Sequence, residues 1–265
     1  MLQAKMMSKI ISIHAFRGGT GKSNITANLA ALLATEGCRV GIIDTDIQSP
    51  GIHVLFDLDE HPPRRSLNDY LRGKCQLQDT TYNVTPQLKM DVPGQLMVIP
   101  KGQLFLIPSS VHVDEISRVL REGYDVHLLN EGMRKLIREL ALDVLLIDTH
   151  PGLNEETLLS IAVSDALVIV LRPDQQDYQG TGVTIDVARK LAMPHLMLIV
   201  NQVPTIFDFA AVKAQMESTY DCEVAAVLPH SNEMLSLGSA GLFVQHYPDH
   251  PITQSLRQVA VRLMQ

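Results

Sequence analysis

The sequence predicts an α/β fold in which a mostly parallel, twisted β-sheet carries helices on both faces. Apolar runs of strand length recur along the chain, at residues 9–16, 39–44, 95–100, 143–148, 166–171, 195–200 and 223–228. Their near-continuous apolar character is typical of strands that are buried on both faces. Longer amphipathic stretches separate most of these runs, and we expect helices at residues 22–37 and 130–140 among them. Strands that alternate with helices form parallel sheets, because each helix returns the chain across a face of the sheet in a right-handed crossover.

Two segments differ from this alternation. Residues 57–94 are rich in proline and contain few apolar runs, so we expect an excursion from the sheet with short helices rather than a second domain. Residues 251–265 open with a proline suited to the first turn of a helix and repeat apolar residues on one face, at Ile252, Leu256, Val259, Ala260 and Leu263. Two arginines and no lysine are few charges for a helix that lies in a membrane surface. We therefore expect this helix to close over the core of a single domain that spans residues 1–265.

Composition and charge limit the classes of partner. At 265 residues with 46% hydrophobic content, the chain is long enough to bury a sizeable core. A net charge of −7 excludes a surface built throughout for nucleic acid or anionic lipid, and leaves a local basic patch open. Cys38, Cys75 and Cys222 lie far apart and form no C-x-x-C pair, which indicates neither a disulfide framework nor a metal knuckle. The beginning of the chain lacks the apolar region of a signal peptide, and no apolar run approaches the roughly 18 residues of a membrane span. We expect a cytoplasmic protein without a stable membrane anchor.

A glycine-rich loop lies between the first predicted strand and the first predicted helix. The three glycines within residues 18–21 allow backbone N–H groups to turn toward an anion, and the helix dipole adds positive potential there. Lys22 can reach phosphates, and the Ser23 hydroxyl can bind Mg²⁺. The common pattern G-x-x-x-x-G-K-[ST] is matched incompletely, because Phe16 stands where its first glycine would fall. The loop therefore predicts a phosphate site of uncertain kind.

Acidic residues follow two further strands. Asp44 and Asp46 come at the carboxyl end of the second predicted strand, and Asp148 comes at the end of strand 143–148. Ligands bind at this edge of open parallel sheets. Alternation within an extended segment points Asp44 and Asp46 the same way, toward a γ-phosphate, its metal and the attacking water. A carboxylate at Asp148 can hold Mg²⁺, directly or through a water. Together with the loop, these residues predict a site for a nucleotide and a metal ion.

With these motifs the chain resembles the ParA/MinD group of deviant Walker A ATPases. The resemblance covers nearly the whole chain. Residues 17–30 are similar to the family's K-G-G-x-G-K-[ST] loop and following helix, residues 40–56 to its switch I region, and residues 145–153 to its Walker B strand and switch II. Residues 198–203 are similar to the strand that ends in an adenine-reading asparagine, and residues 227–244 to the proline loop and helix that complete the base pocket. Residues 95–100 resemble the strand before the family's partner-contact helices.

The resemblance implies a P-loop NTPase fold and an ATPase that uses ATP and Mg²⁺. Asp46 would position the hydrolytic water, with Lys22 and Arg17 assisting at the phosphates. The residues implied to bind the nucleotide are Gly18, Gly19, Thr20, Gly21, Lys22, Ser23, Asn24, Asn201 and Pro229, and those implied at the metal are Ser23, Asp44 and Asp148. The Asn201 amide would offer adenine the donor and acceptor pair that its edge requires, and Pro229 would line the base pocket. Without the resemblance, an asparagine after a strand is a common turn residue.

Two positions depart from the family pattern. Arg17 stands at the hallmark lysine, which in the family's ATP-bound sandwich dimer crosses to the partner's phosphates. An arginine suits this role in trans, because its planar guanidinium bridges phosphate oxygens with two hydrogen bonds and stays charged. The alternative is a pairing in cis with a carboxylate, in a site that works as a monomer. His150 occupies a switch II position where the family tends to have a small residue or proline, and we expect a partly exposed switch residue rather than a catalytic group or pH sensor.

The leading functional hypothesis is an ATPase that forms a homodimer around ATP·Mg²⁺ and uses hydrolysis as a timer for positioning or partitioning cellular cargo. A protein partner or cargo adaptor would stimulate its slow turnover. The alternative is a nucleotide-dependent localisation adaptor of the pilus or secretion type with little hydrolysis, and the complete acidic set favours hydrolysis over it. An iron–sulfur carrier is disfavoured because the cysteines form no paired motif.

The cations leave DNA binding open. The cluster of Arg64, Arg65, Arg72 and Lys74 is expected to be a solvated face, and the C-terminal third offers only scattered cations. Non-specific DNA binding, with association to the nucleoid, therefore stays an option that the sequence does not decide.

Overall fold

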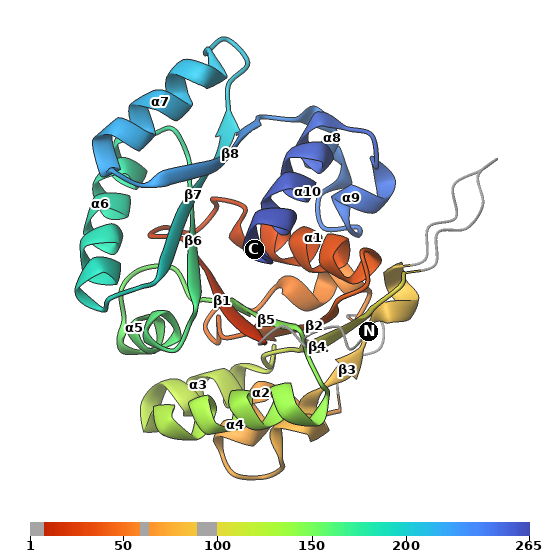
Figure 1. Ribbon diagram of the computed structural model, residues 1–265. Helices are drawn as coiled ribbons and strands as arrows, with labels where there is room; N and C mark the ends of the chain where they lie inside the picture. Colours follow the sequence, from red (N-terminus) through yellow and green to blue (C-terminus); the bar gives the residue numbers. More distant parts are fainter. Residues whose placement is uncertain (1–7, 59–63, 89–99) are drawn as a thin grey trace, which may run out of the picture.

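The computed structural model describes residues 8–58, 64–88 and 100–265, which form an eight-stranded β-sheet with helices on both sides (Figure 1). The strands are β1 (Lys9–His14), β2 (Arg39–Asp44), β3 (Tyr82–Asn83), β4 (Gln103–Ile107), β5 (Val144–Asp148), β6 (Ala166–Leu171), β7 (His195–Val203) and β8 (Glu223–Pro229). Their order is β3-β4-β2-β5-β1-β6-β7-β8, and all neighbours are parallel except β3, which pairs antiparallel with β4. The predicted fold class, a mostly parallel sheet flanked by helices, is confirmed.

The helices divide between the two faces of the sheet. One face carries α1 (Lys22–Thr35), α8 (Asn232–Leu237), α9 (Phe243–His246) and α10 (Pro251–Leu263). The other face carries α2 (Leu67–Leu71), α3 (Val113–Glu122) and α4 (Val126–Glu139) beside β2, β4 and β5, and α5 (Glu155–Ala162), α6 (Gln175–Lys190) and α7 (Phe209–Tyr220) beside β6, β7 and β8. Side chains of the sheet therefore contribute to three hydrophobic clusters, one on the first face and two on the other.

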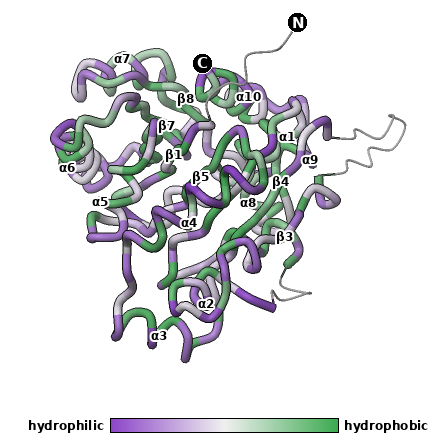
Figure 2. The backbone as a smooth tube through the Cα atoms, turned by 60° about the horizontal axis from the view of Figure 1, so that its bottom comes forward, coloured by the Kyte–Doolittle hydropathy of each residue, from purple (hydrophilic) through white to green (hydrophobic). Residues whose placement is uncertain are grey.

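Strands buried on both faces explain the continuous apolar runs of the sequence. Along β6, Ala166, Val168 and Val170 pack in the cluster with α1, while the alternate residues Leu167, Ile169 and Leu171 pack in the cluster with α5, α6 and α7. In Figure 2 the central strands are mostly hydrophobic, whereas hydrophilic and hydrophobic stretches alternate along α3 and α4. Burial on two faces thus selects apolar residues at every position of a central strand.

Most of the predicted strands are confirmed, and two strands, β3 and β4, were not predicted. Six of the seven predicted runs correspond to β1, β2, β5, β6, β7 and β8. The remaining prediction, residues 95–100, lies outside the described residues except for Pro100, which is not in a strand. The strand beside β2 is β4, Gln103–Ile107, which the sequence analysis did not predict.

The two predicted helices and the C-terminal helix are also confirmed. Helix α1 is followed by Gly37, whose positive φ of 113° suits a glycine at a helix end. Helix α4 begins four residues before the predicted start at residue 130, because the Asp125 carboxylate accepts hydrogen bonds from the first-turn N–H groups of His127 and Leu128. Helix α10 starts at Pro251 and buries the five predicted apolar residues against the sheet.

The segment of residues 57–94 is an excursion with short helices, as predicted, in its described parts. It contains α2 and two short 3₁₀ helices, η2 (Leu77–Thr80) and η3 (Thr85–Leu88). Strand β3 was not expected: its two residues join the edge of the sheet beside β4.

Within the described ranges, no helix combines the length and apolar character needed to cross a bilayer. Cys38, Cys75 and Cys222 are free and half-buried.

Replacing Asn28 by alanine tests how α1 and α9 are joined. Asn28 is fully buried, and its Oδ1 accepts a hydrogen bond of 2.9 Å from the backbone N–H of Val244 in α9. The Asn28→Ala substitution leaves this buried N–H without a partner, so we expect the free energy of unfolding to fall by about 1–3 kcal/mol in urea denaturation. The Asn130→Ala substitution, which removes a hydrogen bond on the exposed side of α4, is the control and should change it by less than about 0.5 kcal/mol. Equal effects of the two substitutions would contradict this account.

Candidate functional site

The glycine-rich loop joins the carboxyl end of β1 to the first turn of α1. Gly21 immediately precedes α1 with a φ of 87°, a conformation that disfavours any side chain. A Cβ atom on Gly21 would also lie 2.6 Å from the Asn201 side-chain nitrogen. Phe16, which breaks the common phosphate-loop pattern, packs its ring against Gly180 of α6, where a Cβ would overlap it. The loop is therefore held close to both β7 and α6.

Three polar groups of α1 converge on the Asp148 carboxylate at the end of β5. The Lys22 Nζ lies 2.8 Å from Asp148 Oδ1 in an ion pair whose side chains are 6% and 1% exposed. The Ser23 hydroxyl donates to Asp148 Oδ2 at 2.6 Å, and the Thr26 hydroxyl donates to Oδ1 at 2.9 Å. The structure thus brings together the predicted phosphate lysine, the predicted metal-binding serine and the predicted Walker B aspartate. Thr26 is a member of this group that the sequence analysis missed.

Asp44 lies beside Asp148, because β2 and β5 pair in a register that places the two residues opposite each other. Its side chain is completely buried. Oδ1 accepts the backbone N–H of Asp46 at 3.0 Å, while Oδ2 is buried without a hydrogen-bond partner among the described residues. Burial raises the pKa of the Asp44 carboxyl well above its ordinary value, and the neighbouring Asp148 carboxylate raises it further.

This arrangement fits a magnesium ion that is partly held by other ligands. Mg²⁺ prefers oxygen ligands and retains waters, so the Ser23 hydroxyl and the two carboxylates are suitable donors. The unpartnered Oδ2 of Asp44 is the kind of buried oxygen that a cation would satisfy. In the described part of the chain, no group of three or more His, Cys, Asp or Glu side chains could hold a metal ion by itself. These residues therefore fit a magnesium ion only if it takes further ligands from outside this set.

Asp46 and His150, which each follow Asp44 and Asp148 by two residues, are in direct contact. The His150 Nδ1 lies 2.7 Å from Asp46 Oδ1, with the two side chains 20% and 9% exposed. His150 is partly exposed, as expected, but its contact with the predicted water-positioning residue was not anticipated. The register between β2 and β5 explains the contact, because Asp44 pairs with Asp148 and the two contacting residues come at the same distance after them.

Arg17 pairs with carboxylates of its own chain. Its Nη1 lies 3.6 Å from Asp174 Oδ1 and 3.8 Å from Asp177 Oδ1, and its side chain is 39% exposed. Arg172 shares the same two carboxylates at 3.2 and 3.3 Å. This is the cis arrangement that was the alternative for Arg17, and its role in trans stays a prediction. The Asp174 carboxylate is 39% exposed, whereas that of Asp177 is only 2% exposed, so Arg17 joins one exposed and one buried carboxylate.

Asn201 and Pro229 lie at the carboxyl ends of β7 and β8. The Asn201 Nδ2 donates to the Thr20 carbonyl in the glycine-rich loop at 2.8 Å, and the adjacent Gln202 Nε2 donates to the Gly19 carbonyl at 3.3 Å. A cavity of about 460 Å³ opens nearby and is lined by Gln202, Pro204, Thr205, Ile206, His230 and Asn232. The adenine role of Asn201 stays a prediction. None of the six residues that line this cavity was among the predicted site residues.

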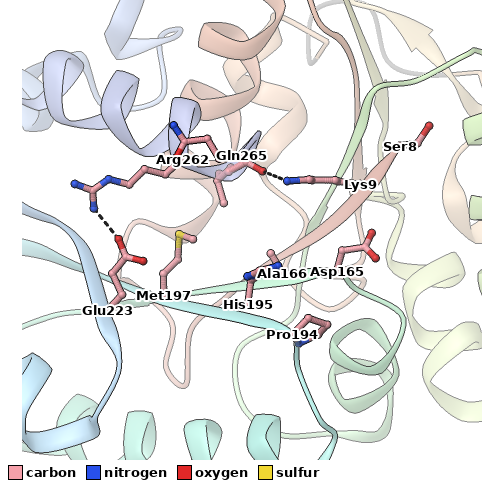
Figure 3. Close-up of a pocket in the computed structure, with 11 residues that line it drawn as sticks. Ser8, Lys9, Asp165, Ala166, Pro194, His195, Met197, Glu223, Arg262 and Gln265 are labelled. Atoms are coloured by element: carbon pink, nitrogen blue, oxygen red, sulfur yellow. Dashed lines mark hydrogen bonds and ion pairs between the residues drawn. The ribbon is translucent and has the colours of Figure 1, made fainter. Parts of the chain in front are cut away.

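A second cavity, of about 560 Å³, lies at the opposite end of the sheet (Figure 3). It is lined by residues at the amino-terminal ends of β1, β6, β7 and β8 and at the end of α10. Its cations have partners within the chain: Arg262 pairs with Glu223 at 2.8 Å, and the Lys9 Nζ donates to the Leu263 carbonyl at 3.2 Å. None of the predicted site residues lies there.

Together, the sheet order, the loop before α1 and the acidic strand ends define a P-loop NTPase fold. The profile of a protein family described as an AAA domain matches residues 8–196, and the chain belongs to this family. Among solved structures, the septum site-determining protein MinD of Pyrococcus horikoshii in complex with Mg-ADP shares the fold, with a TM-score of 0.77 over 97% of this chain and 96% of that chain at 21% identity.

Two sequence relatives extend the comparison. An uncharacterized ATP-binding protein of Methanocaldococcus jannaschii is 29% identical over 260 residues, which cover 98% of this chain and 89% of the relative. The flagellum site-determining protein YlxH of Helicobacter pylori is 30% identical over 198 residues, which cover 74% of this chain and 58% of that protein. These findings place the chain in the AAA-domain family and show that it shares the fold of MinD.

Replacing Asp44 by asparagine tests the electrostatic strain of the site. The pKa of Asp44 is raised in the folded state, so ionisation of this carboxyl opposes folding. The destabilisation is absent below the ordinary carboxyl pKa of about 4, grows as the pH rises above it, and is complete above the raised pKa. In buffer with a chelator, we expect the Asp44→Asn variant to be more stable than the natural protein at pH 7 in urea denaturation. The gain should disappear as the pH falls toward 4. The exposed Asp249→Asn substitution is the control and should give no such pH-dependent gain. If the Asp44→Asn variant were less stable than the natural protein at pH 7, the ionised Asp44 carboxylate would not be destabilising.

Proposed function

We propose that the protein is an ATP-binding and ATP-hydrolysing switch that positions or partitions cellular cargo. The observation that carries this proposal is the convergence of Lys22, Ser23 and Asp148 within hydrogen-bond distance at the mouth of the glycine-rich loop. The relatives add to it, because one is described as ATP-binding and another as determining the site of a flagellum. We take residues 1–265 as one domain that carries out this function in the cytoplasm.

The proposed chemistry assigns each group a task. The N–H groups of the loop residues Gly18 to Asn24 would cradle the phosphates, and the Lys22 ammonium would neutralise their charge. Ser23, Asp44 and Asp148 would hold Mg²⁺, which when bound supplies charge neutralisation at the phosphates. The Asp46 carboxylate would accept a hydrogen bond from the attacking water and so orient it.

The proposed switch depends on a homodimer. Arg17 would leave Asp174 and Asp177 and contact the nucleotide of a second copy of the chain, where its guanidinium can bridge two phosphate oxygens. A protein partner or cargo adaptor would then stimulate slow hydrolysis, and loss of the γ-phosphate would release the loops that follow β2 and β5. Non-specific DNA would be a further partner if the nucleoid serves as the matrix, and no stable membrane anchor is part of the proposal.

Asp46→Ala tests whether hydrolysis belongs to this site. Because the substitution removes the group that orients water and leaves the phosphate contacts, we expect Mg²⁺-dependent ATP hydrolysis to fall about 100-fold or more while ATP binding is retained. Phosphate release and equilibrium binding of ATP measure the two effects. The exposed Asp249→Ala substitution is the control and should leave both unchanged.

The outcomes separate the hypotheses. Natural protein that neither binds nor hydrolyses ATP with Mg²⁺ would refute the proposed function. Natural protein that binds ATP and does not hydrolyse it would favour the localisation adaptor.

Arg17→Ala tests the role of the arginine in trans. In the Asp46→Ala background, where ATP persists, we expect ATP to shift the chain to a dimer in size-exclusion chromatography with light scattering. The additional Arg17→Ala change should abolish this shift, whereas Arg17→Lys should retain it because the cation is kept. Arg65→Ala, a change at an exposed arginine, is the control. An unchanged dimer in the Arg17→Ala variant would show that Arg17 acts only in cis.

A further inference from the structure

His150 holds the proposed water-orienting carboxylate by a single short contact. Its Nδ1 is 2.7 Å from Asp46 Oδ1, the distance of a charge-assisted hydrogen bond. An ionised carboxylate only accepts hydrogen bonds, so the imidazole must donate from Nδ1. The two side chains are 20% and 9% exposed, so water competes for this bond only weakly.

The contact leaves one oxygen of Asp46 available. In the described part of the chain, both hydrogen bonds to the Asp46 side chain end on Oδ1, one from His150 and one of 3.2 Å from the backbone N–H of Ser49. Oδ2 can therefore accept from a water. Because the two oxygens are rigidly joined, a donor that anchors Oδ1 also sets the direction in which Oδ2 points.

His150 is itself held at its backbone. Its carbonyl accepts a hydrogen bond of 3.3 Å from the Thr157 hydroxyl in the first turn of α5. Its neighbour Thr149 donates from its hydroxyl to the Ile13 carbonyl of β1 at 3.1 Å, and the N–H of Gly152 donates to the Ala15 carbonyl at 3.1 Å. The imidazole is thus mounted on a segment attached to β1 and α5, whereas Asp46 lies in the loop after β2.

We propose that His150 is a positioning residue for hydrolysis: its Nδ1–H fixes the Asp46 carboxylate so that Oδ2 faces the attacking water. The proposal rests on the proposed ATPase function and adds a residue to it. His150 makes no contact with the substrate in this role and acts through Asp46 alone. Its removal should therefore lower kcat and leave the KM for ATP almost unchanged.

Asparagine and glutamine at position 150 form a matched pair for the test. An asparagine amide nitrogen occupies nearly the position of the histidine Nδ1, whereas a glutamine amide nitrogen corresponds to Nε2. We expect His150→Ala and His150→Gln to lower kcat by about tenfold or more, with KM changed by less than about twofold. His150→Asn should restore kcat to within about threefold of the natural protein. His127→Ala, at an exposed histidine of α4, serves as the control.

The results distinguish this proposal from a failure of the proposed function. Absence of ATP hydrolysis in the natural protein would refute the function itself. Hydrolysis that depends on Asp46 and is unaffected by His150→Ala, or a His150→Asn variant as slow as His150→Ala, would overturn the role of His150 alone.

A measurement on the natural protein covers the case in which the variants do not fold. The imidazole ¹⁵N spectrum, with His150 assigned, should show the tautomer protonated at Nδ1. An imidazole protonated only at Nε2 would overturn the proposal, because its Nδ1 could not donate to Asp46.

Discussion

The buried ion pair between Lys22 and Asp148 is the interaction on which the rest of the site depends. It joins the first turn of α1 to the end of β5 at 2.8 Å, and the hydroxyls of Ser23 and Thr26 donate to the same carboxylate. A buried carboxylate that lost these donors would cost several kcal/mol, so α1, the glycine-rich loop and β5 share one arrangement in which their polar groups are satisfied. The left-handed conformation at Gly21 is the local condition for this approach.

The same arrangement contains an unfavourable component. Asp44 is fully buried beside Asp148, and one of its oxygens has no hydrogen-bond partner among the described residues. The Lys22 ammonium compensates the charge of Asp148 at close range, whereas the buried Asp44 carboxylate raises the electrostatic energy of the fold. Functional sites commonly retain such destabilising groups because the ligand supplies the missing partner. A divalent cation with a preference for oxygen is the ligand that fits this pair of carboxylates.

Three other predicted site residues, Asp46, Arg17 and Asn201, have partners within the same chain. Asp46 pairs with His150, Arg17 with Asp174 and Asp177, and the Asn201 amide with the Thr20 carbonyl. These contacts connect the loops that follow β1, β2, β5 and β6, and they join the first of these loops to the last residues of β7. A ligand that displaced one of these partners would link its own binding to a rearrangement of the loops. This is the physical basis on which such a site can act as a switch.

The sequence by itself determined the elements whose signals are local. The continuous apolar runs of β1, β2, β5, β6, β7 and β8, the glycine-rich turn before α1 and the one-sided apolar face of α10 each follow from neighbouring residues. The parallel sheet then follows because alternating strands and helices have few other ways to pack. The edge strand β3 was not predicted, because a run of two residues carries too little pattern. Strand β4 was not predicted, because the apolar run at residues 95–100, a few residues before it, gives the same strand signal.

Only the tertiary structure decided which side chains meet. His150 and Asp46 are 104 residues apart, and they touch because β2 and β5 are neighbours in a register that pairs Asp44 with Asp148. The partners of Arg17 depend on where α6 begins relative to the glycine-rich loop. Strand order, register and helix placement are set by long-range packing, and the pattern of residues within any one segment does not contain them.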